Sequence, residues 1–340
     1  MKLVYSDRQL EHAPPVFVVS GAEQPNPEVP ERALRLLDAG IRFGLERVAP
    51  DACDDDVLEA VHSKRYLTFL ENIHRRWQYI SGASAAVIPN IHPDGRDGGY
   101  PASAVGQAGF HIYDGSCPVV AETWDSARHS ASSAIHAARD VLAGADACYA
   151  LCRPPGHHAG RDLVGGFCYL NNAALAASIL REQHQRVAIL DIDVHHGNGT
   201  QDIFFARSDF LTISLHADPV RFYPFFWGYA NERGVTEGEG FNLNVPLERG
   251  LGDDEYLVAL DSALERIVDY DPGAVVIALG LDAHESDPFQ GLCITTDGFR
   301  RIAAAIASLR LPTVLVQEGG YLSDFLAGNL EAFLQGFTGD

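Results

Sequence analysis

Five short apolar segments from residue 146 onward are each followed closely by a cluster of polar residues. The segments are residues 146–151, 186–190, 210–215, 274–279 and 312–316, and the clusters read RPPGHH, DIDVHHGNG, SLH, GLDAHESDP and EGGY. Continuous apolar runs of this length, separated by amphipathic helical stretches, predict a mostly parallel α/β sheet with helices on both faces. Because ligands bind outside the carboxyl ends of strands in such open sheets, the five clusters predict one shared site.

The remaining sequence is compatible with one domain over residues 1–340. Helical patterns are expected at about 29–48 and 56–77 and at 172–181, 253–269 and 296–309. Residues 80–121 are rich in Gly, Pro, Ser and Ala and have weak periodicity, so we expect a long loop insertion there with a role in function or in an interface. No linker or internal repeat divides the chain.

The charge and the cysteine content limit the classes of function. The formal net charge is −21, which argues against binding to nucleic acids or anionic membranes, since both require basic surfaces. An acidic surface favours cationic substrates such as polyamines, although many cytosolic proteins are acidic for no such reason. The N-terminus lacks the apolar run of a signal peptide, and six cysteines without a C-x-x-C pair do not suggest a disulfide framework. We therefore expect a cytoplasmic protein with reduced thiols.

A metal site is predicted after the second and fourth apolar segments. Asp191, Asp193 and His195 alternate with a period of two, so that on an extended backbone they would point the same way, and Asp282 follows the fourth segment. Two carboxylates and an imidazole with one open position suit a catalytic zinc ion, and the same ligand types also serve Fe(II) and Mn(II). The alternative is that Asp193 or Asp282 caps a helix.

Acid–base groups are predicted beside this metal. His157 and His158 are adjacent on a loop stiffened by Pro and Gly, and a carboxylate partner would keep one imidazole charged while an amide partner would leave the other neutral. Asp191 and Asn198 are candidates for these two partners. Tyr321 follows two glycines in EGGY, where a phenol can approach a reacting centre and donate to a developing oxyanion. Taken singly, a histidine pair or a tyrosine is more often a surface or core feature.

Taken together, RPPGHHA, GGFCYLNN, DIDVHHGNGTQ, SLH, GLDAHESDP and EGGY resemble the zinc-dependent histone deacetylase superfamily. Within it the chain is most similar to the bacterial acetylpolyamine amidohydrolases and to class II-like deacetylases, over nearly its whole length. The resemblance implies the arginase–deacetylase fold and hydrolysis of an N-acyl, typically acetyl, amide. The substrate would be a small cationic amine, such as an acetylpolyamine, or acetyl-lysine.

The resemblance also implies roles for single residues. It assigns one zinc ion, replaceable by Fe²⁺ or Co²⁺, to Asp193, His195 and Asp282. It makes His157 an electrostatic group paired with Asp191. It makes His158 the general base and then the general acid, with Asn198 as its partner, and Tyr321 the residue that polarises the amide carbonyl.

Structural potassium ions and a substrate tunnel are implied in the same way. Asp191 and Ser214, with backbone carbonyls of Asp193, His195 and Leu215, match a first potassium site. A second potassium site matches the backbone positions of Phe204, Arg207, Phe210 and Phe241. The tunnel would be lined by Gly166, Phe167, Tyr223 and Phe289, whose aromatic faces suit an extended aliphatic amine and could make cation–π contact with its second charge.

The 80–121 segment bears on assembly and on substrate choice. With GQAGF and ETW it resembles the insertion through which acetylpolyamine amidohydrolases dimerise, so we expect a homodimer. Those enzymes carry an acidic residue just before the Gly-Gln pair, where this chain has Val105, so we expect no strong preference for charged diamines. The alternatives are a broad-specificity small-molecule or protein-lysine deacylase, an arginase-like ureohydrolase, and a non-catalytic acyl-amine binding protein.

Overall fold

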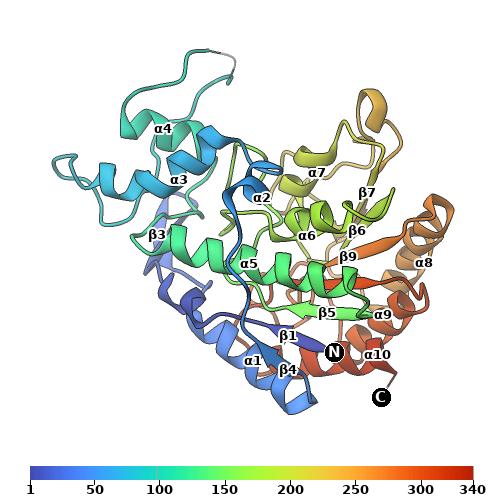
Figure 1. Cartoon of the computed structure of the whole chain (residues 1–340). Coiled ribbons are helices and arrows are strands. Elements are labelled where there is room, and N and C mark those ends of the chain that lie inside the picture. The colour runs from blue at the N-terminus through green and yellow to red at the C-terminus, as the bar shows by residue number, and fades with distance from the viewer. Residues whose placement is uncertain (97, 340) are drawn as a thin grey trace.

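The computed structural model describes residues 1–96 and 98–339 and contains an eight-stranded parallel sheet between two layers of helices (Figure 1). The strand order across the sheet is β4-β1-β5-β10-β9-β6-β7-β8, and every neighbouring pair is parallel. The strands are β1 (Lys2–Val4), β4 (Glu46–Val48), β5 (Ala147–Ala150), β6 (Val187–Asp191), β7 (Phe210–Ala217), β8 (Asn242–Leu247), β9 (Ala274–Leu279) and β10 (Thr313–Gln317). This architecture confirms the predicted fold class.

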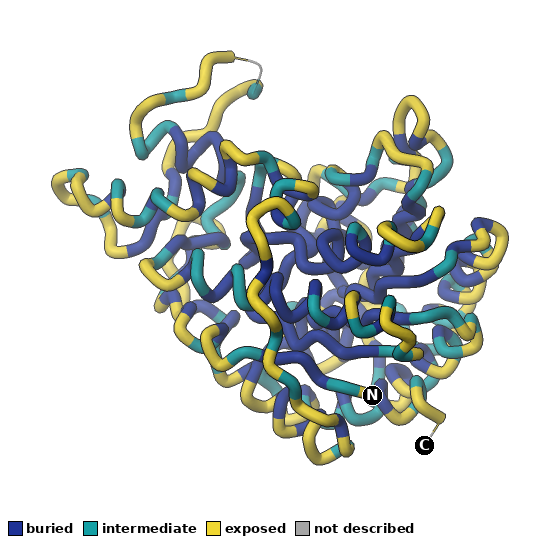
Figure 2. The backbone as a smooth tube through the Cα atoms, in the orientation of Figure 1, coloured by how far each residue is buried: buried dark blue, intermediate teal, exposed yellow. Residues whose placement is uncertain are grey.

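The five predicted apolar segments form five adjacent strands in the middle of this sheet, β5, β10, β9, β6 and β7. Every residue of β6, β7, β9 and β10 is buried, as expected for strands covered on both faces. Figure 2 shows these strands as the continuous dark-blue centre of the molecule. The polar clusters that follow the strands are thereby brought to one edge of the sheet.

Two groups of helices cover the two faces. One apolar cluster includes residues of α3, α5 and α6, and the other includes residues of α1, α8, α9 and α10. In Figure 1, α5 lies across the near face of the sheet. The helices are α1 (Pro30–Phe43), α2 (Asp55–Glu59), α3 (Lys64–Trp77), α4 (Ala104–His111), α5 (Thr123–Leu142), α6 (Asn172–Leu180), α7 (Asn198–Phe204), α8 (Asp253–Tyr270), α9 (Thr296–Ala307) and α10 (Leu326–Thr338), with short 3₁₀ turns at Asp7–Glu11 and Thr236–Gly238. None of the helices in the described part of the chain has both the length and the apolar character needed to cross a bilayer.

Several element boundaries differ from the sequence-based expectation. The helix expected at 29–48 ends at Phe43, because Gly44 adopts a left-handed conformation (φ 100°) and the chain turns into β4. The helix expected at 56–77 is two helices, and the second begins where the hydroxyl of Ser63 accepts a hydrogen bond from the Tyr66 N–H. The expectation that 80–121 lacks regular structure was also wrong in part, since α4 lies within it behind a Ser103 cap.

A two-stranded antiparallel hairpin stands apart from the main sheet. It is formed by β2 (Val16–Val19) and β3 (Ala22–Pro25), and neither strand was expected from the sequence. Phe17 on β2 is buried and packs against Phe167, with ring centroids 5.6 Å apart. The hairpin therefore reaches the region where the polar clusters converge.

Candidate active site

The side chains of Asp193, His195 and Asp282 meet beyond the carboxyl ends of β6 and β9. One ligand atom from each lies within 4.8 Å of the other two, and all three residues are buried. The Nδ1 atom of His195 lies 3.1 Å from Oδ1 of Asp193 and 3.2 Å from Oδ2 of Asp282. The strand ends at Asp191, and the backbone then bends instead of staying extended. The expectation that Asp191 points the same way was therefore wrong, because its carboxylate turns to His157.

The chemistry of this group fits a bound divalent cation. Within 4 Å, the recorded ion pairs of Asp193 and Asp282 in the described part of the chain are with histidines only, so neither buried carboxylate is neutralised by a lysine or arginine. Their other contacts are with backbone N–H groups of His195, Gly319 and Val194, so neither carboxylate caps a helix. A side chain at Gly319 would press against both carboxylates, which makes glycine necessary there. Two carboxylates and one imidazole suit zinc, and by ligand type alone also iron or manganese.

The two tandem histidines have different partners, as predicted. Nδ1 of His157 lies 2.9 Å from Oδ2 of Asp191, and Nδ1 of His158 lies 2.7 Å from Oδ1 of Asn198. Both imidazoles are buried beside the metal group, and the rings of His158 and His195 lie 5.9 Å apart. Their proximity follows from the sheet topology, because β5 and β6, which have β10 and β9 between them, both end at this edge.

These partners move the two pKa values in opposite directions. Burial opposes the charged form of His157, but the carboxylates of Asp193 and Asp191 outweigh it and raise the pKa of His157 well above its ordinary value. Burial and the positive charge of His157 lower the pKa of His158 well below its ordinary value. The site therefore holds one charged imidazole beside one neutral imidazole that can accept a proton.

Tyr321 is positioned through the backbone of its own loop. Its N–H donates to Oδ2 of Asp287 (3.0 Å), and the buried guanidinium of Arg32 donates to the carbonyls of Gly320 (2.5 Å) and Glu318 (2.9 Å). The same guanidinium lies over the Tyr321 ring, 4.7 Å from its centroid. Neither Asp287 nor Arg32 was singled out from the sequence, although Asp287 lies within the quoted GLDAHESDP motif.

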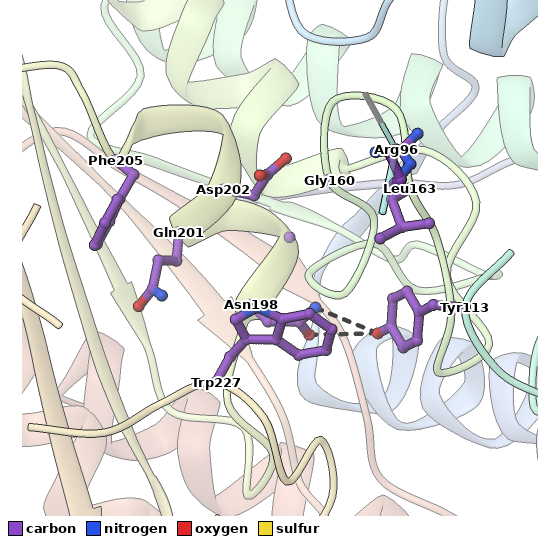
Figure 3. A pocket seen from close by; sticks show the side chains of 10 residues that line it. Arg96, Tyr113, Gly160, Leu163, Asn198, Gln201, Asp202, Phe205 and Trp227 are labelled. Atoms are coloured by element: carbon purple, nitrogen blue, oxygen red, sulfur yellow. Dashed lines mark hydrogen bonds between the residues drawn. The ribbon is translucent and has the colours of Figure 1, made fainter. Parts of the chain in front are cut away.

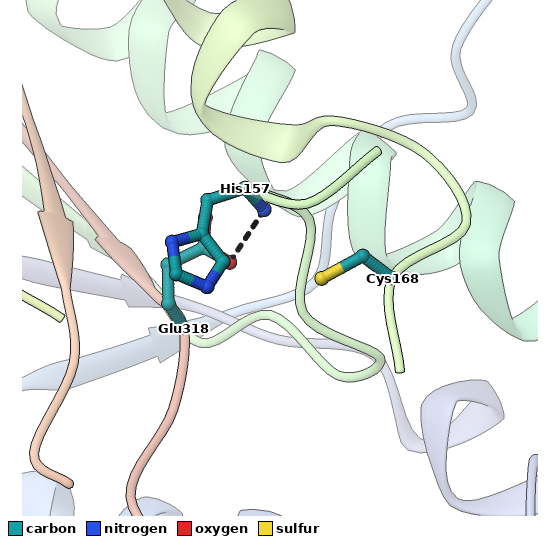
Figure 4. Close-up of side chains that lie close together, drawn as sticks. All are labelled: His157, Cys168 and Glu318. Carbon is teal, nitrogen blue, oxygen red and sulfur yellow. Dashed lines mark hydrogen bonds between the residues drawn. The ribbon is translucent and has the colours of Figure 1, made fainter. Parts of the chain in front are cut away.

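Glu318 lies beside His157 (Figure 4). Its Oε2 atom accepts hydrogen bonds from the N–H groups of Gly156 (2.6 Å) and His157 (3.0 Å), and its Oε1 atom is buried without a partner in the described part of the chain. His157, Cys168 and Glu318 also gather ligand atoms within 4.8 Å. However, Nδ1 of His157 is engaged by Asp191, and Oε2 of Glu318 is engaged by two backbone N–H groups. Cys168 is moreover not one of the carboxylates that an arginase-like two-metal site would need, so the geometry does not favour a ureohydrolase.

A largely aromatic cavity of about 240 Å³ leads to the histidines and Tyr321. All four residues predicted for the tunnel line it, namely Gly166, Phe167, Tyr223 and Phe289. The ring of Tyr321 lies 4.7 Å from that of Phe289 and 6.0 Å from that of Phe167. These walls suit a slender aliphatic chain.

Phe17 and Arg221 are among the lining residues that were not expected from the sequence. Phe17 comes from the β2–β3 hairpin, which is far from the motifs in the chain and carries no recognisable signal. Arg221 is exposed and, among the described lining residues, is the one with a permanent charge. Its position six residues after Leu215 in the SLH segment was the available signal. No carboxylate lines the cavity in the described part of the chain.

The residues predicted to bind potassium can be located in the structure, but their contacts do not test whether an ion binds to them. Asp191 and Ser214 are directly paired across β6 and β7. Of the second set, the rings of Phe204 and Phe210 stack 4.1 Å apart, and the Phe241 carbonyl accepts a hydrogen bond from the N–H of Thr212. Leu215 is buried in β7, and Arg207 lies over the Phe210 ring. Potassium at either position remains a prediction.

Comparisons with known proteins agree with this geometry. The model of the histone deacetylase domain family matches residues 26–337. The chain is 45% identical over 334 residues to acetylpolyamine amidohydrolase of Burkholderia pseudomallei, covering 98% of this chain and 97% of that protein, and 42% identical to acetylpolyamine amidohydrolase 1 of Pseudomonas aeruginosa, covering 100% and 99%. The crystal structure of the acetylpolyamine aminohydrolase from B. pseudomallei superimposes with a TM-score of 0.96 at 44% identity, covering 99% of this chain and 98% of that one.

Proposed function

This chain belongs to the histone deacetylase family and is an amide hydrolase, and from that premise we propose that it removes the acetyl group from N-acetylated polyamines and related slender acylated amines. The proposal depends on one observation: three sets of groups lie together at the end of one aromatic cavity. They are the Asp193–His195–Asp282 group, the two histidines with different partners, and Tyr321. The full-length similarity to acetylpolyamine amidohydrolases supports the choice of substrate class.

His158 is the base of the proposed reaction. A zinc ion held by Asp193, His195 and Asp282 would supply Lewis acidity toward the acyl carbonyl and toward water. The neutral Nε2 atom of His158 takes a proton from the attacking water, because its Nδ1 proton is held by Asn198. The same Nε2 then delivers that proton to the departing amine nitrogen. Acetic acid and a free amine are the products, and they separate as acetate and an ammonium ion once the acid gives its proton to the amine.

Charge that develops on the acyl oxygen is balanced by groups of this chain. The Tyr321 hydroxyl donates a hydrogen bond to that oxygen, and the glycines before Tyr321 allow its loop to approach the site. The charged imidazole of His157, fixed by Asp191, adds positive potential beside the reacting carbon. Burial of all these groups strengthens their electrostatic effect, since water is largely excluded.

A panel of substrates tests the proposed function. Release of acetate is measured with acetylputrescine, acetylcadaverine, acetylspermidine and an acetyl-lysine peptide. We expect turnover of the small acetylated amines at higher kcat/KM than of the peptide. Efficient deacetylation of peptides with no turnover of small amines would favour the alternative of a protein-lysine deacylase.

We also propose that the enzyme is a cytoplasmic homodimer formed through the 80–121 segment. The segment protrudes from the sheet beside α3 in Figure 1 and exposes Ile91. All six cysteines are free, as in a reducing compartment. Light scattering should give twice the chain mass, and a monomeric mass would contradict the proposed dimer.

A further inference from the structure

A row of hydrogen bonds leads from the tunnel wall to the partner of the proposed base. The Tyr223 hydroxyl lies 2.6 Å from Oδ2 of Asp114 and 2.8 Å from the Tyr113 hydroxyl. The Tyr113 hydroxyl lies 3.3 Å from Nδ2 and 3.4 Å from Oδ1 of Asn198. Oδ1 of Asn198 in turn lies 2.7 Å from Nδ1 of His158.

The number of available protons determines which group donates and which accepts in each of these hydrogen bonds. An ionised carboxylate only accepts, and Asp114 also accepts the N–H groups of Ser116 (2.9 Å) and Gly166 (3.2 Å). The pKa of Asp114 is raised because burial outweighs the hydrogen bonds from Tyr223 and these two N–H groups. The carboxylate is nevertheless the acceptor of this row because each of its oxygens already faces a backbone N–H group, which can only donate. The single proton of Tyr223 therefore goes to Asp114, which leaves the Tyr223 oxygen to accept the proton of Tyr113.

The same count orients the amide of Asn198. Because Tyr113 has given its proton to Tyr223, its oxygen can only accept, and the Asn198 group that faces it must be the Nδ2 donor. The amide oxygen is then left for Nδ1–H of His158. A flipped amide would present a donor to Nδ1, move the imidazole proton to Nε2 and remove the lone pair that a base needs.

Packing holds the two tyrosines in this row. The Tyr113 ring lies 5.4 Å from that of Trp227, and the Tyr223 ring stands edge-on to His158 at 5.0 Å. Figure 3 shows Tyr113, Asn198 and Trp227 around a second cavity, with the Tyr113–Asn198 contacts dashed. Tyr113 and Asn198 thus separate this second cavity from the active-site tunnel, which Tyr223 and His158 line from the other side.

We propose that Asp114, Tyr223 and Tyr113 are positioning residues that fix the amide of Asn198 and, through it, the Nδ1-protonated tautomer of His158. Tyr223 therefore has a second task besides forming the tunnel wall. The inference rests on the proposed role of His158 as the base, but the tautomer itself is measurable without any substrate.

Tyr113→Phe and Tyr223→Phe keep the rings and remove one hydroxyl each. Long-range ¹H–¹⁵N spectra of histidine-labelled protein, loaded with zinc, report the tautomer of His158, whose signals are assigned by their loss in His158→Ala. We expect Nδ1–H alone in the parent protein and a mixture of tautomers in both variants. We expect kcat to fall about tenfold, the effect of one misplaced hydrogen bond, with KM little changed. The double variant should lose no more than Tyr113→Phe alone, because both act through one row.

Tyr5→Phe is the matched control, since the Tyr5 hydroxyl is buried without a hydrogen-bond partner in the described part of the chain. It should leave the His158 signals unchanged. An unchanged His158 tautomer in both network variants, or additive losses of kcat in the double variant, would overturn the proposal. Absence of activity on every acetylated amine would instead count against the proposed function, and the spectra would still decide the tautomer.

Discussion

The imidazole rings of His157 and His158 lie with their centroids 4.0 Å apart, yet one is bound to a carboxylate and the other to an amide. His157 is therefore kept charged and His158 neutral, which assigns the proton transfers to His158. We expect His158→Ala to lower kcat/KM by about 10²–10⁴-fold, the usual contribution of a general base, and His157→Ala to lower it less. Steady-state kinetics with equal zinc content in both variants checks this, and the reverse order would mean that the two roles are exchanged.

Replacing Tyr321 by Phe removes the proposed donor to the acyl oxygen and keeps the ring that packs against Phe289 and Phe167. We expect a loss of about 2–4 kcal/mol of transition-state stabilisation, the range found for a single oxyanion donor. The measurement is kcat/KM with the zinc content verified. A rate equal to that of the parent enzyme would show that another group donates to the oxygen.

Arg221 should weaken the binding of cationic substrates at the tunnel mouth. With Val105 at the position of the expected acid and no carboxylate among the described lining residues, acetylputrescine should have no strong advantage over neutral N-pentylacetamide of matched length. Arg221→Ala should raise the kcat/KM ratio of charged to neutral substrate several-fold at low salt, because like charges repel.

Arg221→Lys keeps the charge and should leave this ratio nearly unchanged. A strong preference of the parent enzyme for acetylputrescine would mean that another acid binds the distal amine. The 80–121 segment contains two aspartates at its tip, Asp94 and Asp97. Asp94 is the one to replace first in that case, because Asp97 lies outside the described residues.

Acid should destabilise the fold through buried neutral histidines, of which His62 is a clear case. Its Nδ1 donates to the carbonyl of Gly160 (3.0 Å) and its Nε2 accepts the N–H of Asn171 (2.9 Å), so a second proton has no acceptor. Burial lowers the pKa of His62 from 6.5 to about 4. The unfolded chain is therefore protonated first, and stability is lost as the pH falls from about 6.5 to about 4.

The contribution of His62 is separable from that of the other histidines. Between pH 7.5 and pH 5, the parent protein should lose about 2 kcal/mol more unfolding free energy than His62→Gln, which can still donate and accept. Denaturant unfolding at the two pH values measures this. Equal losses in the two proteins would show that His62 is not a source of the acid sensitivity.

The sequence was sufficient for the centre of the sheet and for the site at its edge. The five apolar runs form adjacent strands, as their continuous apolar composition predicts for strands that are buried on both faces. The polar residues that follow them meet at one edge because the strands are parallel. The sequence named Asp191 and Asn198 as candidate partners of the two histidines, and the resemblance to the deacetylase family supplied which of them pairs with which histidine.

Other parts of the structure depend on packing that no local pattern records. Phe17 reaches the tunnel through a hairpin whose strands are short and largely exposed, so the alternation that marks a half-buried strand is absent. Tyr113 and Asp114 become neighbours of Asn198 and Tyr223 only through tertiary contacts. The bend after Asp191 was not predicted, because the apolar run before Asp191 predicts a strand but does not show at which residue that strand ends.

Titration of metal-free enzyme with zinc tests the central claim most directly. The claim is that Asp193, His195 and Asp282 bind one ion on which amide hydrolysis depends. After chelation, acetate release from acetylputrescine should be abolished and then rise in proportion to added zinc, reaching a plateau at one zinc per chain, with cobalt also restoring activity. Asp282→Ala should bind zinc weakly and stay inactive. Full turnover by metal-free Asp282→Ala, or a plateau at two ions per chain with release of urea from a guanidino substrate, would contradict the account.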